Sequence, residues 1–203
     1  MSKKLNVLLD LDQTVISSVP WETFDSDENE NKVVDHFHNG WHDMEGYYIV
    51  FERPDLQKFL DYLFKNFNVY VWTAASKDYA LFIIQNCLLK KKNRKLECIF
   101  FSYHCDKARK HFGGTKNLRL LWERYGLEGV TPQNTVIIDD LGDVHKTQPK
   151  NCIAIEPFEF EDEGSEGDSV LLGTIKPQLK KMNSEYVKRE ENGDLGSFVP
   201  VAA

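Results

Sequence analysis

The chain has 203 residues, 41% of them hydrophobic and 12% aromatic, a composition typical of a globular protein with a sizeable core. Its formal net charge of −7 disfavours general binding to nucleic acid. No apolar run approaches the roughly 20 residues that cross a bilayer, and residues 1–4 lead into an apolar strand, not a cleavable signal. We therefore expect an intracellular protein without a membrane segment.

The first predicted element is a buried strand, Val7-Leu8-Leu9, which is followed by Asp10-Leu11-Asp12-Gln13-Thr14. A strand alternates its side chains, so the two carboxylates share a face, where they repel each other unless a cation or a shared proton intervenes. One carboxylate of such a pair can attack phosphorus, while the other protonates the leaving oxygen and then activates water. A polar turn that closes a strand is the alternative that these residues leave open.

An insert follows, from about residue 19 to residue 52. Residues 25–31 are strongly polar and predict an exposed loop tip, while Phe37, Trp41 and residues 47–49 indicate short flanking strands. We expect a hairpin and not a lid, which leaves a site open enough for a protein chain. Shielding of a sheet edge is a second role, compatible with the first.

The histidines and cysteines predict no metal site. His36, His38 and His42 share no clear spacing with a cysteine or a further acidic ligand, which favours surface histidines. The four cysteines form no CxxC pair, so we expect them to be reduced.

The middle of the chain predicts a helix, a strand and a second helix. Apolar residues recur at helical spacing between Leu56 and Phe67, and residues 68–72 form a strand rich in β-branched and aromatic residues. That strand ends in Thr73-Ala74-Ala75-Ser76, whose hydroxyls and amides suit phosphate oxygens. The basic run of residues 90–95 predicts a solvated loop, with steering of an acidic phosphopeptide as an alternative.

The last third of the chain adds an amine and two carboxylates. Lys116 lies at the predicted start of a helix that ends at Gly126, and the strand of residues 135–138 ends in Asp139-Asp140, a pair of oxygen ligands suited to a divalent cation. A closing helix follows from about residue 170 to residue 182, with Pro177 kinking it or moving its start. Strands alternate with helices, so we expect an α/β fold in which these groups converge at the carboxyl ends of parallel strands.

The chain resembles the haloacid-dehalogenase superfamily in four ordered motifs: Asp10-Leu11-Asp12-Gln13-Thr14, Thr73, Lys116 and Asp139-Asp140. It is similar in further detail to the branch related to phosphatases of the RNA polymerase II C-terminal domain. That likeness is carried by Arg53-Pro54, residues 72–80, Lys116-Asn117-Leu118 and residues 151–158. Together the motifs span about residues 5–185.

The resemblance implies a Rossmann-type parallel sheet flanked by helices, with a small β insert and no large cap domain. Residues 1–185 would form one domain, and residues 186–203 a flexible tail. It also implies Mg²⁺-dependent hydrolysis of a phosphomonoester through an aspartyl-phosphate, with phosphoserine or phosphothreonine in a protein as substrate. The C-terminal domain of RNA polymerase II is the leading specific partner.

The resemblance also assigns roles to residues. Asp10 is the nucleophile and Asp12 the acid and base, while Thr73, Ala74 and Lys116 bind the phosphoryl group. Mg²⁺ is bound by the Asp10 carboxylate, the Asp12 backbone carbonyl and Asp140, and Asp139 positions Lys116 and contributes to the metal site.

The chain departs from the family pattern in several places, so the substrate is less defined than the chemistry. Gln13 stands where many members carry glutamate, and Asp140-Leu141-Gly142 where many carry asparagine-serine-proline. A polynucleotide end, a small phosphorylated molecule and a role as a non-catalytic scaffold are the alternatives.

Overall fold

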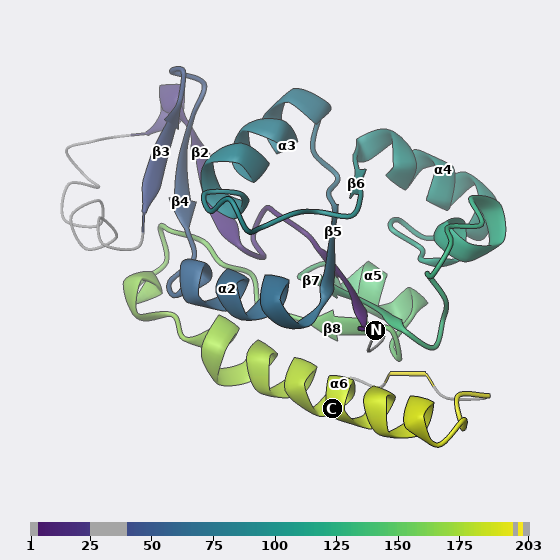
Figure 1. The fold of residues 1–203 in the computed structure, drawn as a ribbon. Helices are drawn as coiled ribbons and strands as arrows, with labels where there is room; N and C mark the ends of the chain where they lie inside the picture. Colours follow the sequence, from purple (N-terminus) through teal and green to yellow (C-terminus); the bar gives the residue numbers. More distant parts are fainter. Residues whose placement is uncertain (1–3, 25–39, 197–198, 201–203) are drawn as a thin grey trace.

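A five-stranded parallel sheet lies at the centre of the computed structural model, which describes residues 4–24, 40–196 and 199–200 (Figure 1). The strand order is β6-β5-β1-β7-β8. The strands are β1 (Asn6–Leu9), β5 (Asn68–Trp72), β6 (Ile99–Phe100), β7 (Thr135–Asp139) and β8 (Cys152–Ala154). The predicted α/β fold is confirmed, with β1, the strand that precedes Asp10, in the middle of the sheet.

Helices cover both faces of this sheet because successive strand residues point to opposite sides. Val7 and Leu9 belong to the apolar cluster on one face, whereas Leu8 belongs to the cluster on the other, and all three are fully buried. Burial of one such side chain contributes roughly 1.5–3 kcal/mol. The first face packs against α2 (Leu56–Asn66), α3 (Lys77–Ile83), η2 (Ile84–Leu88), η5 (Leu171–Ile175) and α6 (Lys176–Glu191). The second packs against α4 (Ser102–Phe112), η3 (Leu120–Arg124) and α5 (Gly142–Thr147).

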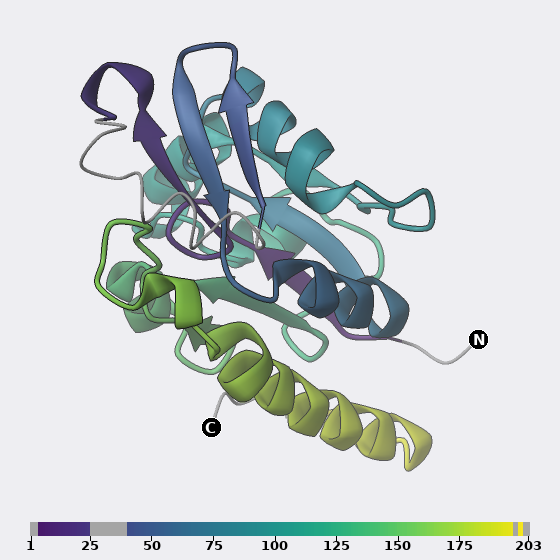
Figure 2. The same ribbon diagram turned by 90° about the vertical axis from the view of Figure 1, so that its left-hand side faces the viewer.

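The insert is a three-stranded antiparallel sheet, in the order β2 (Ile16–Pro20), β4 (Tyr48–Glu52) and β3 (Trp41–Met44). The expected hairpin corresponds to β3 and β4 alone, because β2 directly follows the first motif and pairs with β4 from far along the chain. Phe51 stacks on Phe160 with ring centroids 3.7 Å apart. Figures 1 and 2 show this small sheet beside α3, at the end of the molecule away from α6. The predicted loop tip and Phe37 lie outside the described residues.

The prediction of a solvated loop at residues 90–95 is wrong for Arg94, and Lys90, although exposed, has a buried partner. The Arg94 guanidinium is fully buried; it forms an ion pair with Asp61 at 2.8 Å and donates to the backbone carbonyls of Gln57 and Leu88. Lys90 Nζ lies 2.5 Å from a carboxylate oxygen of the fully buried Glu52. These contacts replace water around buried charge and connect the segment to α2 and to the small sheet.

The closing helix begins as the π-helical turn η5 and continues as α6, with Pro177 in the first turn of α6. The proline therefore fits the change from one helix to the next, since its missing amide is not needed there. The helix extends to Glu191, past the predicted boundary at position 185, and Tyr186 is buried. Among the helices in the described part of the chain, none has the length and apolar character of a membrane span.

Arg53, directly after β4, connects three distant segments although it is fully buried. Its Nε and Nη2 atoms form a two-pronged contact with the Asp168 carboxylate at 3.1 and 2.8 Å. Its Nη1 donates to the carbonyls of Thr14 and Glu156 at 3.0 and 2.9 Å. One guanidinium thus fixes the loop after Asp12 to the small sheet and to the acidic loop that precedes η5.

We expect Arg53→Lys to lower the free energy of unfolding by roughly 2–4 kcal/mol, because lysine keeps the charge but loses the planar set of donors. Urea denaturation measures this change. Arg124→Lys, at an exposed position, is the matched control and should change stability by less than about 0.5 kcal/mol. Equal effects of the two substitutions would contradict the importance of the buried contacts.

Candidate active site

Asp10, Lys116 and Asp139 meet at the carboxyl ends of β1 and β7. These strands pair in register, Leu9 with Ile138, so the next residue of each strand places its carboxylate at the same edge of the sheet. Lys116 Nζ lies 2.7 Å from Asp10 Oδ1 and 2.8 Å from Asp139 Oδ2. The three side chains are almost completely buried, so each depends on the others for compensation of its charge.

A third carboxylate joins this group. Oxygen atoms of Asp10, Asp139 and Asp140 lie within 4.8 Å of one another, and Thr14 Oγ1 donates to Asp140 Oδ1 at 3.1 Å. Burial raises the pKa of Asp10 and of Asp139, an effect that the nearby Lys116 ammonium opposes. With all three carboxylates ionised, one ammonium leaves two negative charges uncompensated. An all-oxygen cluster with this charge fits a divalent cation.

The backbone of Lys116 adopts a left-handed conformation with φ of 52°, which is unfavourable for a residue with a side chain. It lies in a turn between α4 and η3, slightly before the predicted helix. Gln148 stabilises this turn by donating to the Lys116 carbonyl and accepting from the Leu118 amide, both at 2.9 Å. The loop after α5 thereby determines where the ammonium lies.

Thr73 and Ala74 follow β5, the neighbour of β1 on its other side. Thr73 is buried; its amide donates to the Phe100 carbonyl and its hydroxyl accepts from the Ala75 amide at 3.0 Å. The hydroxyl can still donate a hydrogen bond to a phosphate oxygen. Ala74 is exposed at the surface of this loop. Both residues lie at the sheet edge that carries Asp10, as the sequence predicts.

The Asp12 carboxylate is not among the three clustered carboxylates. Its Oδ1 accepts a short hydrogen bond from the Tyr79 hydroxyl, which also contacts Ser18 Oγ at 2.7 Å. Burial raises the pKa of Asp12, and the Tyr79 hydrogen bond opposes this shift. Sequence reasoning missed Tyr79 as a site residue, although its motif segment was recognised, because only the fold brings α3 over the first motif.

The residue after Asp12 has its own partner. Gln13, with φ of 58°, donates a short hydrogen bond from Nε2 to Glu159 Oε1, and Ser17 Oγ donates to Glu159 Oε2 at 3.2 Å. The Phe158 amide donates to the Gln13 carbonyl at 2.7 Å. The acidic loop thus fixes the conformation of the turn that carries Asp12.

The prediction of surface histidines is wrong for His42, while His36 and His38 lie outside the described residues. His42 Nε2 is 3.0 Å from Glu52 Oε1, and these groups lie close enough to Cys87 Sγ to form a cluster of potential ligands. Lys90 already compensates the Glu52 charge and Gln57 donates to its second oxygen at 2.7 Å. The cluster therefore connects the small sheet to α2 and η2 without needing a bound metal ion. All four cysteines are free, as predicted.

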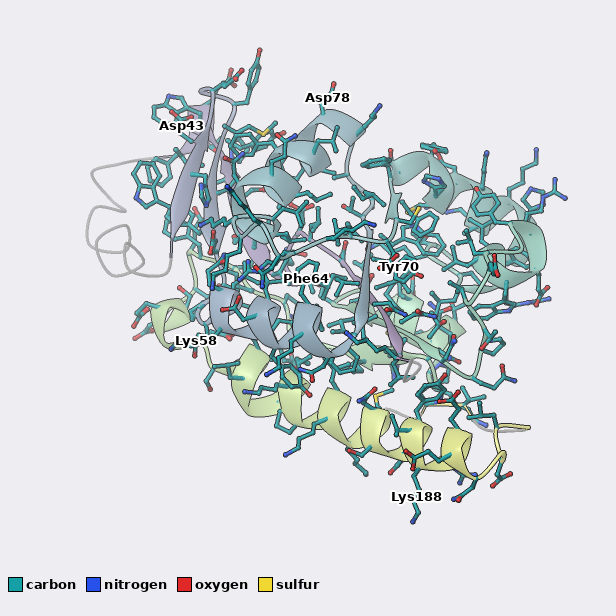
Figure 3. All side chains as sticks on the ribbon, in the orientation of Figure 1. Asp43, Lys58, Phe64, Tyr70, Asp78 and Lys188 are labelled. Atoms are coloured by element: carbon teal, nitrogen blue, oxygen red, sulfur yellow. The ribbon has the colours of Figure 1, made fainter. Side chains whose placement is uncertain are left out.

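A groove of about 670 Å³ adjoins Asp12 between the small sheet and α3. It is lined by Asp12, Ser18, Met44, Tyr47, Tyr48, Ala75, Ser76, Asp78 and Tyr79. Figure 3 shows Asp78 on α3 and Asp43 on β3 at one end of the molecule, with Lys188 of α6 at the other.

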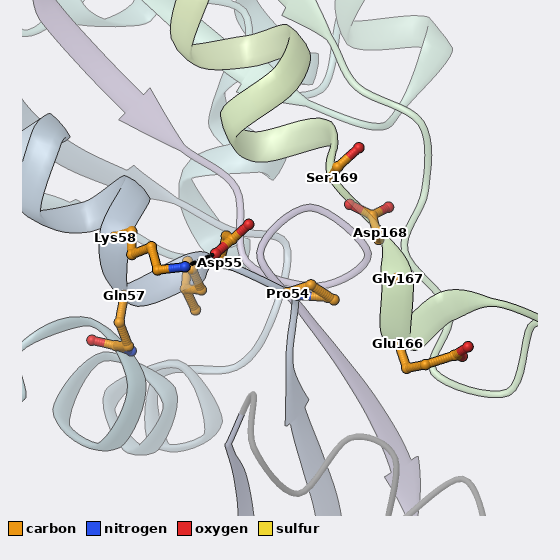
Figure 4. Close-up of a pocket in the computed structure, with 9 residues that line it drawn as sticks. Pro54, Asp55, Gln57, Lys58, Glu166, Gly167, Asp168 and Ser169 are labelled. Carbon is orange, nitrogen blue, oxygen red and sulfur yellow. Dashed lines mark hydrogen bonds and ion pairs between the residues drawn. The ribbon is translucent and has the colours of Figure 1, made fainter.

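A second hollow, of about 410 Å³, lies between the start of α2 and the acidic loop (Figure 4). The only ion pair drawn there joins Lys58 to Asp55, and its lining includes none of the predicted site residues.

Comparison with known proteins identifies the chain as a member of a phosphatase family. Residues 5–189 match the family described as NLI interacting factor-like phosphatase, and the chain belongs to that family. It is 43% identical to the CTD phosphatase-like protein 355R of Invertebrate iridescent virus 6, over 82% of this chain and 93% of the relative. The corresponding protein of Invertebrate iridescent virus 3 is 39% identical, over 86% and 95%.

Solved structures share the fold. A structure of the fission yeast RNA polymerase II CTD phosphatase Fcp1 bound to beryllium fluoride matches with a TM-score of 0.57 at 22% identity, over 95% of this chain. A second structure of Fcp1, described as an essential RNA polymerase II CTD phosphatase, matches with a TM-score of 0.55 at 23% identity, over 97% of this chain. This chain covers 55% of each of those two structures. The predicted fold class is confirmed.

Replacement of the central ammonium should make stability depend more strongly on pH. In Lys116→Met the pKa values of Asp10 and Asp139 should rise further above their unfolded values, so the native state binds more protons than the unfolded state between about pH 4 and the raised pKa values. Stability should therefore fall as pH rises, with a loss of roughly 3–5 kcal/mol near pH 8 and less near pH 5.

Urea denaturation in chelator at both pH values measures this difference. Lys110→Met, on the exposed face of α4, removes the same charge without burying an unpaired carboxylate. A loss in Lys116→Met that does not change with pH would contradict the role of the ammonium.

Proposed function

We propose that this protein, as a single domain, is a Mg²⁺-dependent phosphoprotein phosphatase that hydrolyses phosphoserine or phosphothreonine through an aspartyl-phosphate on Asp10. The observation that carries the proposal is the buried contact of Lys116 with Asp10 and Asp139, beside Asp140, at the carboxyl edge of the sheet. A carboxylate nucleophile next to a fixed cation is suited to an attack on a phosphate dianion, whose negative charge otherwise repels it.

Two displacements at phosphorus complete the reaction. A carboxylate oxygen of Asp10 forms a bond to phosphorus as the ester P–O bond breaks, and Asp12 donates a proton to the leaving oxygen. In the second step Asp12 takes a proton from water, the water oxygen attacks phosphorus, and the bond to Asp10 breaks to release phosphate. Thr73, Ala74 and Lys116 bind the phosphoryl oxygens in both steps, with donors that are already oriented.

The ligand set proposed for Mg²⁺ is the Asp10 carboxylate, the Asp12 backbone carbonyl, Asp140 and a contribution from Asp139. The fit rests on the donor chemistry: the clustered side-chain atoms are carboxylate oxygens, and their uncompensated charge matches a divalent ion. When bound, Mg²⁺ neutralises negative charge that develops on the transferring phosphoryl group. Lys116 remains the protein's own cation at this position.

The groove beside Asp12 supports a polypeptide substrate over a polynucleotide. Its charged lining residues are Asp12 and Asp78, and no lysine or arginine is among the described residues that line it. Nucleic acid needs cationic partners for its phosphates, whereas apolar residues of a peptide can pack against Tyr47, which is 69% exposed, and Tyr48. Relatives described as CTD phosphatase-like make the RNA polymerase II C-terminal domain the leading substrate, with an intracellular site of action.

The direct test is phosphate release from a phosphoserine C-terminal-domain peptide, an unrelated phosphopeptide and a short 5′-phosphorylated oligonucleotide. We expect release from peptides that requires Mg²⁺ and is lost in Asp10→Asn, which removes the nucleophile with little change of shape. Circular dichroism verifies that the variant is folded. Unchanged turnover in Asp10→Asn would sink the covalent mechanism, and preferential release from the oligonucleotide would replace the proposed substrate class.

Metal binding is testable without turnover. At a Mg²⁺ concentration ten times the Kd, the native state should gain about 1.4 kcal/mol. That gain raises Tm by roughly 3–5 °C in a chain of this size. Asp140→Asn should abolish most of this shift, whereas Asp106→Asn, at an exposed carboxylate on α4, should retain it. An equal shift in both variants would mean that the ion does not bind at the carboxylate cluster.

A further inference from the structure

The carboxylate of Asp12 is held by a chain of two hydroxyl groups. The Tyr79 hydroxyl donates to Asp12 Oδ1 and also lies 2.7 Å from Ser18 Oγ. A phenol has one proton, so while Tyr79 donates to Asp12, its oxygen accepts a hydrogen bond from the Ser18 hydroxyl. In the resulting chain of hydrogen bonds, Ser18 donates to Tyr79 and Tyr79 donates to Asp12.

The small sheet fixes the orientation of this chain. Ser18 lies on β2, and Tyr48, on the neighbouring strand β4, packs the edge of its ring against Tyr79 at a centroid distance of 5.4 Å and an interplanar angle of 80°. Tyr79 itself is on α3. The phenol is therefore contacted from two strands while its own backbone belongs to a helix, which restricts both its ring and its hydroxyl.

We propose that Tyr79 is a positioning residue for Asp12, which keeps Oδ1 occupied so that Oδ2 carries the proton for the leaving oxygen. This inference rests on the proposed phosphatase function. A carboxylic acid has one proton, and an oxygen that accepts a hydrogen bond from Tyr79 is the poorer place for it. As the ester P–O bond breaks, its electron pair goes to the leaving oxygen and the proton moves there from Oδ2, leaving a carboxylate that still accepts from Tyr79.

Two properties separate this role from simple packing. A positioned acid matters most for a leaving group of high pKa, such as the serine alkoxide, and least for a nitrophenolate that departs without a proton. Loss of packing would instead affect all substrates alike. The quantity kcat/KM reports only the steps through formation of the aspartyl-phosphate, so it isolates the acid role of Asp12 from its later role as base.

The experiment measures kcat/KM of Tyr79→Phe for a phosphoserine peptide and a series of aryl phosphates with leaving groups of increasing pKa. We expect a loss of about tenfold or more on the peptide and less than about twofold on dinitrophenyl phosphate, so the dependence on leaving-group pKa becomes steeper. Ser18→Ala should steepen it in the same direction but less. In Asp12→Asn, addition of Tyr79→Phe should cause no further loss.

Tyr62→Phe is the matched control, since it removes a phenol hydroxyl from α2 and should leave the dependence unchanged. The inference would be overturned if a folded Tyr79→Phe protein lost activity equally on all substrates or lost none. The proposed function would still stand in that case, provided that the wild type is active and its activity needs Asp10. If wild type releases no phosphate from any substrate, or Asp10→Asn remains active, the proposed function fails and the inference fails with it.

Discussion

The ammonium of Lys116, buried between two carboxylates, is the interaction on which the site depends. The parallel pairing of β1 with β7 brings Asp10 and Asp139 to one edge of the sheet, where they would repel each other without it. Because a buried charge without a partner costs several kcal/mol, the turn that carries Lys116 must stay in place despite its unfavourable backbone. Its contacts with Gln148 meet this requirement and link the site to the loop after α5.

Buried charge adds to apolar packing in attaching the small sheet to the core. Arg53 reaches the Thr14 carbonyl and Asp168, while Glu52 receives Lys90, His42 and Gln57. Such polar networks depend on direction, so they fix the orientation of the sheet more strictly than apolar packing alone would. The small sheet forms one wall of the groove beside Asp12, and α3 forms the other. The polar contacts therefore fix the position of the first wall.

The sequence could predict the parallel sheet and the position of the candidate site because both depend on local patterns. Each chemical group follows an apolar strand or opens a turn, and parallel strands bring their carboxyl ends together. The pairing of β2 with β4, the burial of Arg94 and the contact of His42 with Glu52 could not be predicted, since their partners lie in distant segments. The hydrogen bond from Tyr79 to Asp12 belongs to the same group, because a helical tyrosine at this spacing is ordinarily a packing residue.

The contact between Gln13 and Glu159 has a consequence for how this chain can vary. The Gln13 amide donates to Glu159, whereas a glutamate at position 13 would place one carboxylate against another. The exchange of glutamine for glutamate is therefore coupled to the residue at position 159 and to Ser17, which shares that partner. We therefore expect substitutions at position 13 to require compensating changes at position 159, which links the acidic loop to the turn that carries Asp12 although they are far apart along the chain.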